Sequence, residues 1–264
     1  MHVTTAQLPP AHASDDKIFA TPDAVIVLDG ASAFRPVPVP ASDYADKLGR
    51  HIVVSLERDP SVDLRAALRS AIEKTAEELS LTPGDSPSST VTILRRKGPS
   101  VDVLALGDSV IVLPDEVVTD DRIDDLNLEP RRLYRERLAS GKGYDDTHRR
   151  LLRELQEQQA VRRNAEGGYW IAEAVPDAAD HAVTASFSVE AVPWAVLATD
   201  GAYDVMTHLG LDDWPVLSKA DGAELSALLE RCQSWEDEVD PAAVSLPRAK
   251  RHDDKAIAVV DVWS

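Results

Sequence analysis

Short apolar runs recur along the chain and predict β-strands. Residues 24–30 (AVIVLDG) indicate a buried strand, residues 194–201 (WAVLATDG) and 256–263 (AIAVVDVW) resemble it, and residues 167–174 (GGYWIAEA) are also strand-like. Runs of this length, ended by Asp-Gly or by other turn residues, are typical of strands rather than of helices.

Residues 89–113 predict a β-hairpin followed by a third strand. The segment TVTIL alternates in polarity, Lys97-Gly98-Pro99 marks a turn, and the segment VDVLAL returns. A second turn at Gly107-Asp108-Ser109 leads into the strand VIVL. Turns are expected at both places because glycine and proline interrupt the apolar pattern.

Apolar residues at helical spacing predict helices between these groups of strands. Leu64, Leu68, Ile72 and Leu79 lie on one side of a helix over residues 63–79. The acidic segment 115–130 is expected to be a loop, and further helices are expected within 131–163, most clearly over 147–161, and at 224–231.

Strands therefore arrive as consecutive hairpins, and helices fall between the groups of strands. This order differs from the regular βαβα alternation of a parallel, doubly wound sheet. It predicts an α+β architecture of antiparallel sheets with helices packed outside them.

The composition is that of a globular protein with a strong acidic excess. Hydrophobic residues make up 44% of the 264 residues, and 46 acidic against 28 basic residues give a formal net charge of -18. Such a charge repels nucleic acid and anionic membranes and attracts cations. Solubility by itself is also a sufficient explanation of the charge. We therefore expect neither a nucleic-acid partner nor a membrane partner.

Cysteine usage and the N-terminal sequence bear on the compartment. Cys232 is the only cysteine, which excludes an intramolecular disulfide and a zinc site built from thiolates. The N-terminal sequence lacks the basic region and apolar core of a signal peptide, and no apolar run approaches the ~20 residues that span a bilayer. These features are compatible with the cytoplasm, which is the location we predict.

Carboxylates recur where a predicted strand meets a loop. Asp29-Gly30 and Asp200-Gly201 end two apolar strands, Asp108 ends a third, Asp253-Asp254 precede the last strand, and Asp15-Asp16 precede an N-terminal apolar segment. Any one of them alone is best explained as a turn residue. If the sheets bring the strand ends together, however, the crowded like charges need protons or cations. Carboxylates without His or Cys favour Mg²⁺ or Mn²⁺, and two such ions can activate water and bind a phosphoryl group.

The order of these motifs resembles that of the metal-dependent protein phosphatases of type 2C, the PPM family. The segment LATDGAYDVM (197–206) is similar to the family's Ser/Thr-Asp-Gly-x-Trp/Tyr-Asp motif, and GDS (107–109) and SSTVTIL (88–94) also fit. The resemblance implies one catalytic domain over residues 1–264, folded as a four-layer α-β-β-α sandwich of two antiparallel sheets flanked by helices. Metal ions would lie at one edge of this sandwich.

The resemblance also implies the ligands of these ions. Those of the first two ions would be Asp29, which bridges both, the Gly30 carbonyl, Asp200 and Asp253, with Asp15 and Asp16 acting mainly through bound waters. Asp108 and Asp204 would hold a third, weaker ion. The implied reaction is hydrolysis of a phosphomonoester by a metal-activated water, with Asp29, Asp200 and Asp253 as the catalytic residues.

The resemblance further implies a flap, over about residues 115–190, that governs substrate access. Many members of the family carry a phosphate-gripping arginine shortly before the acidic pair, but Ala11 stands at that position here. The flap holds many arginines, most of which are expected to pair with neighbouring glutamates on a solvated helix face. A second hypothesis is that Arg162 and Arg163, just before Gly167-Gly168, bind the substrate phosphate in place of the missing arginine.

The sequence thus predicts a phosphomonoester hydrolase that depends on two Mn²⁺ or Mg²⁺ ions, with room for a third, and that acts on phosphoserine or phosphothreonine in proteins. A phosphatase of a small phosphorylated metabolite is an alternative with the same chemistry. A phosphatase-like binding module with little turnover is a third, against which the retained Asp29, Asp108, Asp200 and Asp253 argue. The oligomeric state stays open.

Overall fold

The computed structural model describes residues 1–31 and 36–263 and contains two five-stranded sheets in which every neighbouring pair of strands is antiparallel. The first sheet has the order β1 (His2–Leu8), β10 (Lys255–Asp261), β9 (Trp194–Ala198), β6 (Val110–Val112) and β7 (Val117–Val118). The second has the order β2 (Lys17–Ala20), β3 (Ala24–Leu28), β4 (Val91–Lys97), β5 (Ser100–Leu106) and β8 (Val183–Ser188).

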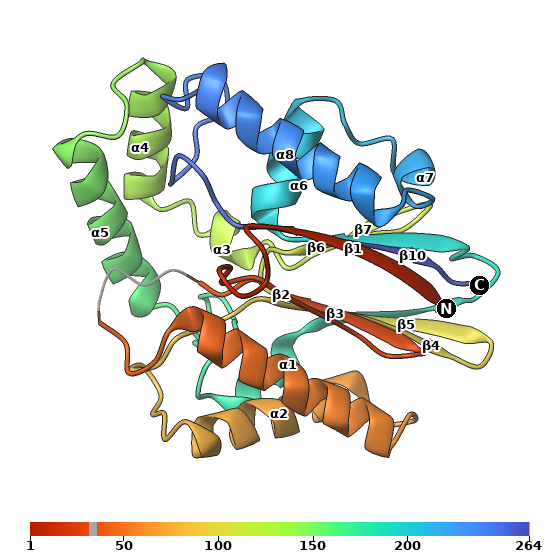
Figure 1. The fold of residues 1–264 in the computed structure, drawn as a ribbon. Coiled ribbons are helices and arrows are strands. Elements are labelled where there is room, and N and C mark those ends of the chain that lie inside the picture. The colour runs from red at the N-terminus through yellow and green to blue at the C-terminus, as the bar shows by residue number, and fades with distance from the viewer. Residues whose placement is uncertain (32–35, 264) are drawn as a thin grey trace.

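The two sheets face each other, and helices cover both outer faces (Figure 1). Helices α1 (Ala41–Arg58) and α2 (Leu64–Glu78) pack on the second sheet, and α6 (Asp200–His208) and α8 (Gly222–Glu238) pack on the first, with the short α7 (Trp214–Leu217) beside α8. This arrangement confirms the predicted α+β architecture and its four layers. None of the helices in the described ranges is long and apolar enough to cross a membrane.

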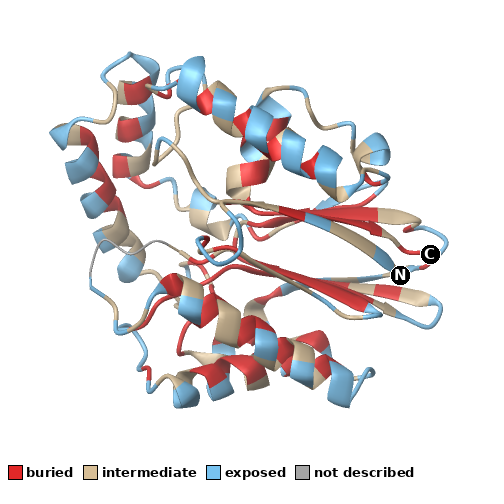
Figure 2. Cartoon of the chain, viewed as in Figure 1, coloured by how far each residue is buried: buried red, intermediate tan, exposed pale blue. Residues whose placement is uncertain are grey.

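The apolar run of β3 is continuous because the strand is buried on both faces. Ala24, Ile26 and Leu28 contact the core under α1 and α2, whereas Val25 and Val27 contact the core between the sheets. Strand β10 divides its side chains in the same way between the inter-sheet core and the core under α6 and α8. Buried residues accordingly fill the middle of the sandwich in Figure 2.

The segment 115–190 carries a pair of helices at one end of the sandwich (Figure 1). These are α4 (Glu129–Ala139) and α5 (Asp146–Ala160), which share a small core that includes Leu138, Leu151 and Leu155. The segment also contains α3 (Arg122–Asp125) and the 3₁₀ helix η1 (Pro176–His181). Residues 131–163 were expected to be helical, most clearly over 147–161, and the structure divides them into two helices because Gly141 and Gly143, with positive φ angles of 75° and 64°, lie between α4 and α5.

Other expectations need correction. The predicted strand 167–174 is wrong: this segment pairs only through isolated bridges, between Ser89 and Ala172 and between Arg163 and Tyr169. The segment 115–130 is not wholly loop, because it holds β7, α3 and the start of α4. Strand β6 follows the β4–β5 hairpin in sequence but pairs with β9 and β7 in the other sheet.

Candidate active site

Asp29 follows directly on β3, and Thr90, just before β4, holds its backbone. The Asp29 amide donates to the Thr90 hydroxyl at 3.1 Å, and the Thr90 amide donates to the Asp29 carbonyl at 2.9 Å. The hydroxyls of Thr90 and Ser109 are 2.7 Å apart, which joins this end of β3 to the loop that carries Asp108. The Ser/Thr-rich segment before β4 thus fixes the strand end that presents Asp29.

Two glycines allow four acidic segments to approach one another. A Cβ atom added to Gly30 would lie 2.8 Å from the Asp15 carbonyl oxygen, and one added to Gly201 would lie 2.2 Å from the Asp254 carbonyl oxygen. Both distances are shorter than a carbon side chain tolerates, so each Asp-Gly pair packs its glycine against the backbone of an acidic pair. The glycines therefore serve close approach rather than a turn.

Hydrogen bonds join the two acidic pairs directly. A side-chain oxygen of Asp254 accepts from the Asp15 amide at 2.6 Å and from the Ser14 hydroxyl at 3.0 Å. Asp16 is 1% exposed. It accepts a hydrogen bond at 2.9 Å from the hydroxyl of Thr199, the residue immediately before Asp200. The N-terminal pair, the last pair and the second Asp-Gly therefore meet at one edge of the sandwich.

The carboxylates act on one another's protonation. Burial and the charges of Asp16 and Asp200 hold the pKa of Asp29 well above its usual range. Burial, with the charges of Asp254 and Asp200, likewise holds the pKa of Asp16 high, against the Thr199 hydrogen bond. Such shifts are expected when like charges crowd in a partly dry site without compensating cations.

The same effect extends to three further predicted ligands, Asp253, Asp108 and Asp204. Burial and the Asp200 charge raise the pKa of Asp253. Burial and the same charge raise the pKa of Asp108 to about 7 and that of Asp204 to about 6. Asp200 therefore lies near the centre of the charge cluster.

A lysine already occupies part of this cluster. Lys250 Nζ lies 2.6 Å from Asp253 Oδ1, and the pKa of Lys250 is raised by the charges of Asp253, Asp29 and Asp200 against the effect of burial. Asp200 Oδ1 in turn accepts from the Gly201 amide at 2.6 Å. Two of the acids are thus engaged with groups of the chain itself.

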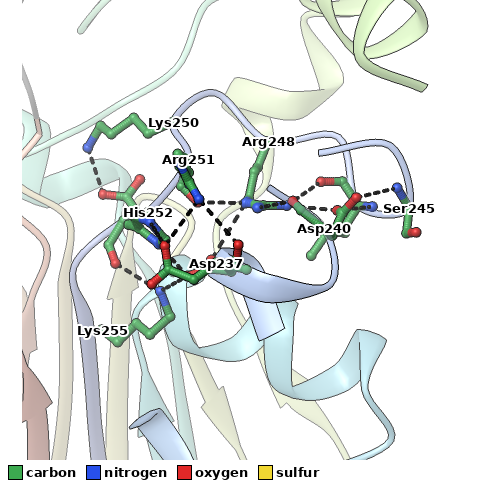
Figure 3. A network of polar contacts seen from close by, with 12 residues as sticks. Asp237, Asp240, Ser245, Arg248, Lys250, Arg251, His252 and Lys255 are labelled. Atoms are coloured by element: carbon green, nitrogen blue, oxygen red, sulfur yellow. Dashed lines mark hydrogen bonds and ion pairs between the residues drawn. The ribbon is translucent and has the colours of Figure 1, made fainter. Parts of the chain in front are cut away.

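The loop that carries Lys250 and Asp253 is anchored to α8 by a network of ion pairs (Figure 3). Arg251 lies 3.3 Å from Asp237, and Arg248 lies 3.6 Å from Glu236, both acids of α8. Glu236 also lies 2.8 Å from Lys255 at the start of β10, with the two side chains 1% and 0% exposed. Arg248 lies 2.9 Å from Asp240, just beyond α8. Asp240 also accepts from three backbone amides of the loop. This anchoring positions the acidic pair before β10.

The donor set suits a hard divalent cation, although the side chains are not arranged around one. Within residues 1–31 and 36–263, no three His, Cys, Asp or Glu side chains converge, as they lie, on a point where they could hold one ion. The ligands available are carboxylate oxygens, and a cation among them would relieve the repulsion that raises their pKa values. An ion bound there would compete with Lys250 for Asp253 Oδ1 and with the Gly201 amide for Asp200 Oδ1.

The arginines predicted to bind phosphate lie elsewhere. Arg162 donates to the Gln158 carbonyl at 2.8 Å, and Arg163 donates to the Tyr169 hydroxyl at 3.1 Å and lies 3.7 Å from the buried Glu173. Neither lines the cavity of about 320 Å³ beside the acids, whose walls include Asp108, Asp200, Asp204 and Asp253. The contacts of both arginines are those of groups that hold the loop after α5.

The cations that do line this cavity are Arg131 and Arg135 of α4, together with Arg248 and Lys250. Sequence reasoning missed them as site residues. Arg131 and Arg135 are four positions apart on one helix and so face the same way, but spacing alone does not tell which face meets the acids. Lys250 was easier to find from the sequence than the two arginines, because it lies only three residues before Asp253.

No model of a known protein family matches the chain, and no curated protein matches it by sequence. Solved structures do match. The catalytic domain of the serine/threonine protein phosphatase PstP, in complex with two manganese ions, is similar with a TM-score of 0.56 and 15% identity, over 98% of this chain and 97% of that one. The chain has the fold of the PPM phosphatases.

Two further structures show the same likeness. The PPM Ser-Thr phosphatase MsPP from Mycobacterium smegmatis, in complex with cacodylate, has a TM-score of 0.55 and 17% identity, over 99% of this chain and 98% of that one. The phosphatase Stp1 from Staphylococcus aureus has a TM-score of 0.59 and 11% identity, over 98% and 94%. The PPM resemblance expected from the motif order is therefore confirmed at the level of the fold, over nearly the whole chain.

Proposed function

We propose that the chain is a metal-dependent phosphomonoester hydrolase of the PPM type that acts on phosphoserine or phosphothreonine in proteins. The observation that carries the proposal is the gathering of Asp16, Asp29, Asp108 and Asp253 around Asp200 at one edge of a PPM-type sandwich, where burial and neighbouring carboxylate charges, that of Asp200 among them, raise the pKa values of the other four. Keeping so many carboxylates together costs stability unless a bound cation offsets it. Metal binding would offset this cost, and so it explains why the carboxylates lie together.

The proposed cofactor is a pair of Mn²⁺ or Mg²⁺ ions, with a third as an option. The complex of PstP with two manganese ions supports this choice. The ligands proposed for the first two ions are Asp29, the Gly30 carbonyl, Asp200 and Asp253, assisted through water by Asp15 and Asp16, and those for a third are Asp108 and Asp204. When bound, such ions lower the pKa of water and neutralise charge on phosphoryl oxygens.

The chain's own residues position these groups. Strand β3 and Thr90 hold the Asp29 backbone, Thr199 orients Asp16, and the Glu236–Lys255 pair fixes the strand that follows Asp253. The catalytic residues proposed are Asp29, Asp200 and Asp253.

A phosphatase assay tests the proposal. The chain is incubated with p-nitrophenyl phosphate and Mn²⁺, with Mg²⁺, and with EDTA, and Asp29→Asn and Asp200→Asn are measured beside it. The proposal predicts turnover with Mn²⁺ or Mg²⁺ that EDTA abolishes and that both variants lose. Asp121→Asn, outside the cluster, serves as the charge-matched control and is expected to retain turnover.

The substrate class is the second part of the proposal. Released phosphate is compared between phosphoserine or phosphothreonine peptides and a panel of phosphorylated metabolites. A phosphoprotein substrate predicts that the peptides have the higher kcat/KM. The reverse ranking would favour the small-metabolite phosphatase.

One observation favours the binding-module alternative. Lys250 neutralises Asp253 within the cluster, so the chain supplies part of the positive charge that an ion would bring. A module of this kind would bind a phosphopeptide but would show no turnover with Mn²⁺ or Mg²⁺. Measuring phosphopeptide binding beside turnover separates it from the enzyme.

A further inference from the structure

The cavity beside the acids is lined by charges of both signs. Asp108, Asp200, Asp204 and Asp253 line it together with Arg131 and Arg135 of α4. A phosphate group that approaches carboxylates is repelled unless cations face it as well. A cation of this lining that has no partner within the protein can therefore receive an anion.

Most cations that line the cavity already have partners. Arg131 is 13% exposed on its side chain and pairs with Asp124, Arg248 pairs with Asp240, and Lys250 pairs with Asp253. The charge of Arg131 also offsets part of the rise in the pKa of Asp108. The charge of each of these three groups is thus largely used within the protein.

Arg135 differs from the other three. Its side chain is exposed, lines the same cavity, and forms no hydrogen bond or ion pair with any residue in the described ranges. Its charge does act on Asp204, which lines the same cavity. An arginine held on a helix, facing a cavity with an open fork of N–H groups, matches the geometry that binds two phosphoryl oxygens.

We propose that Arg135 binds the phosphoryl group of the substrate and of the inorganic phosphate product, in the cavity lined by Asp200, Asp204 and Asp253. This inference rests on the proposed function. It assigns to α4, rather than to Arg162 or Arg163, the phosphate contact of the flap. Arg135 is a substrate-binding residue that orients the phosphoryl group toward the acids, and the acids carry the chemistry.

The rival role of Arg135 is to neutralise Asp204. The two roles differ in what the loss of the guanidinium changes. A phosphate contact affects the affinity for phosphate, whereas neutralisation of Asp204 affects metal affinity or thermal stability and leaves phosphate affinity unchanged.

The test compares Arg135→Ala, Arg135→Lys and the control Arg132→Ala in the full chain with Mn²⁺. Arg132 lies on the same helix, is exposed and pairs with Glu136 and Glu129. For each protein, KM and kcat for p-nitrophenyl phosphate, inhibition by inorganic phosphate, Mn²⁺ affinity and the unfolding temperature are measured. Loss of a charge-assisted contact predicts that Arg135→Ala raises KM and the inhibition constant of phosphate about tenfold to hundredfold.

The conservative variant and the control variant give two further expectations. Arg135→Lys keeps the charge but not the fork and should lie between Arg135→Ala and the unmodified chain, and Arg132→Ala should match the unmodified chain. The inference is overturned if Arg135→Ala leaves both KM and phosphate inhibition unchanged, or changes only Mn²⁺ affinity or the unfolding temperature. If the unmodified chain shows no turnover, the proposed function fails, and calorimetric titration of inorganic phosphate into the Mn²⁺-loaded chain and Arg135→Ala then tests the phosphate contact by itself: equal affinities overturn it.

Discussion

The ammonium group of Lys250 lies 2.6 Å from Asp253 Oδ1, inside the group of carboxylates proposed to bind metal. The charges of Asp29 and Asp200 also act on Lys250. A lysine in this position compensates the crowded negative charge as a cation would. Metal binding at Asp253 therefore competes with an ion pair that the chain provides itself.

Removing the lysine should tighten metal binding. Lys250→Ala frees Asp253, and we expect its dissociation constant for Mn²⁺ to fall about threefold to tenfold, as for a partly exposed ion pair worth ~1 kcal/mol. Titration calorimetry with MnCl₂ measures this, and Lys142→Ala, an exposed lysine of the α4–α5 turn, is the matched control. Unchanged or weaker binding by Lys250→Ala would show that the lysine does not compete with the metal.

The metal-free chain should lose stability as the pH rises. Because the folded-state pKa values of Asp108 and Asp204 are raised to about 7 and about 6, their favourable contribution is complete below the unfolded pKa of ~4 and is lost as the pH passes the folded values. In EDTA, the unfolding temperature is expected to fall from about pH 5 to about pH 8. Asp108→Asn should flatten this profile, and Mn²⁺ should restore stability at the upper end. A profile that Asp108→Asn does not alter would contradict the proposed charge crowding.

Gly201 should not accept a side chain. A Cβ atom at this position would lie 2.2 Å from the Asp254 carbonyl oxygen, so Gly201→Ala must displace the acidic pair before β10. We expect a loss of about 1–3 kcal/mol in the free energy of unfolding and weaker Mn²⁺ binding. Gly222→Ala is the control, since its nearest neighbour would be 3.9 Å away. Chemical denaturation measures both, and equal stability of the two variants would refute the close packing described.

The buried pair of Lys255 and Glu236 should be essential to the fold. Both side chains are almost fully buried, and Glu236→Gln leaves the Lys255 charge without its partner. We expect destabilisation of about 3–5 kcal/mol. Glu154→Gln, which removes the partner of the exposed Arg150, is expected to leave the unfolding midpoint unchanged. A small effect of Glu236→Gln would mean that the pair does not anchor the loop to α8.

Strands and helices that depend on the local pattern of apolar residues were mostly predicted correctly from the sequence. The strands that carry Asp29 and Asp200 were predicted because their apolar runs are buried on both faces and end at Asp-Gly. Helix α1 was missed, although Tyr44, Leu48, Ile52 and Leu56 recur every four residues and are all buried in the structure.

Non-local features were not predictable in the same way. The transfer of β6 to the other sheet depends on which distant strand completes its hydrogen bonds, and no local pattern contains that information. Asp200-Gly201 was expected to end in a loop but begins α6, because Ala202, Val205 and Met206 provide a buried helical face. In the flap, Arg135 and Arg162 belong to similar arginine-rich segments, and only packing brings Arg135 to the cavity.

Release of phosphate from a phosphoserine peptide tests the central claim most directly. The unmodified chain is assayed with Mn²⁺, with Mg²⁺ and with EDTA, beside Asp29→Asn and the control Asp121→Asn. The account predicts turnover that requires Mn²⁺ or Mg²⁺, survives Asp121→Asn and disappears in Asp29→Asn. Absence of turnover with either ion, in a chain that binds the phosphopeptide, would contradict it.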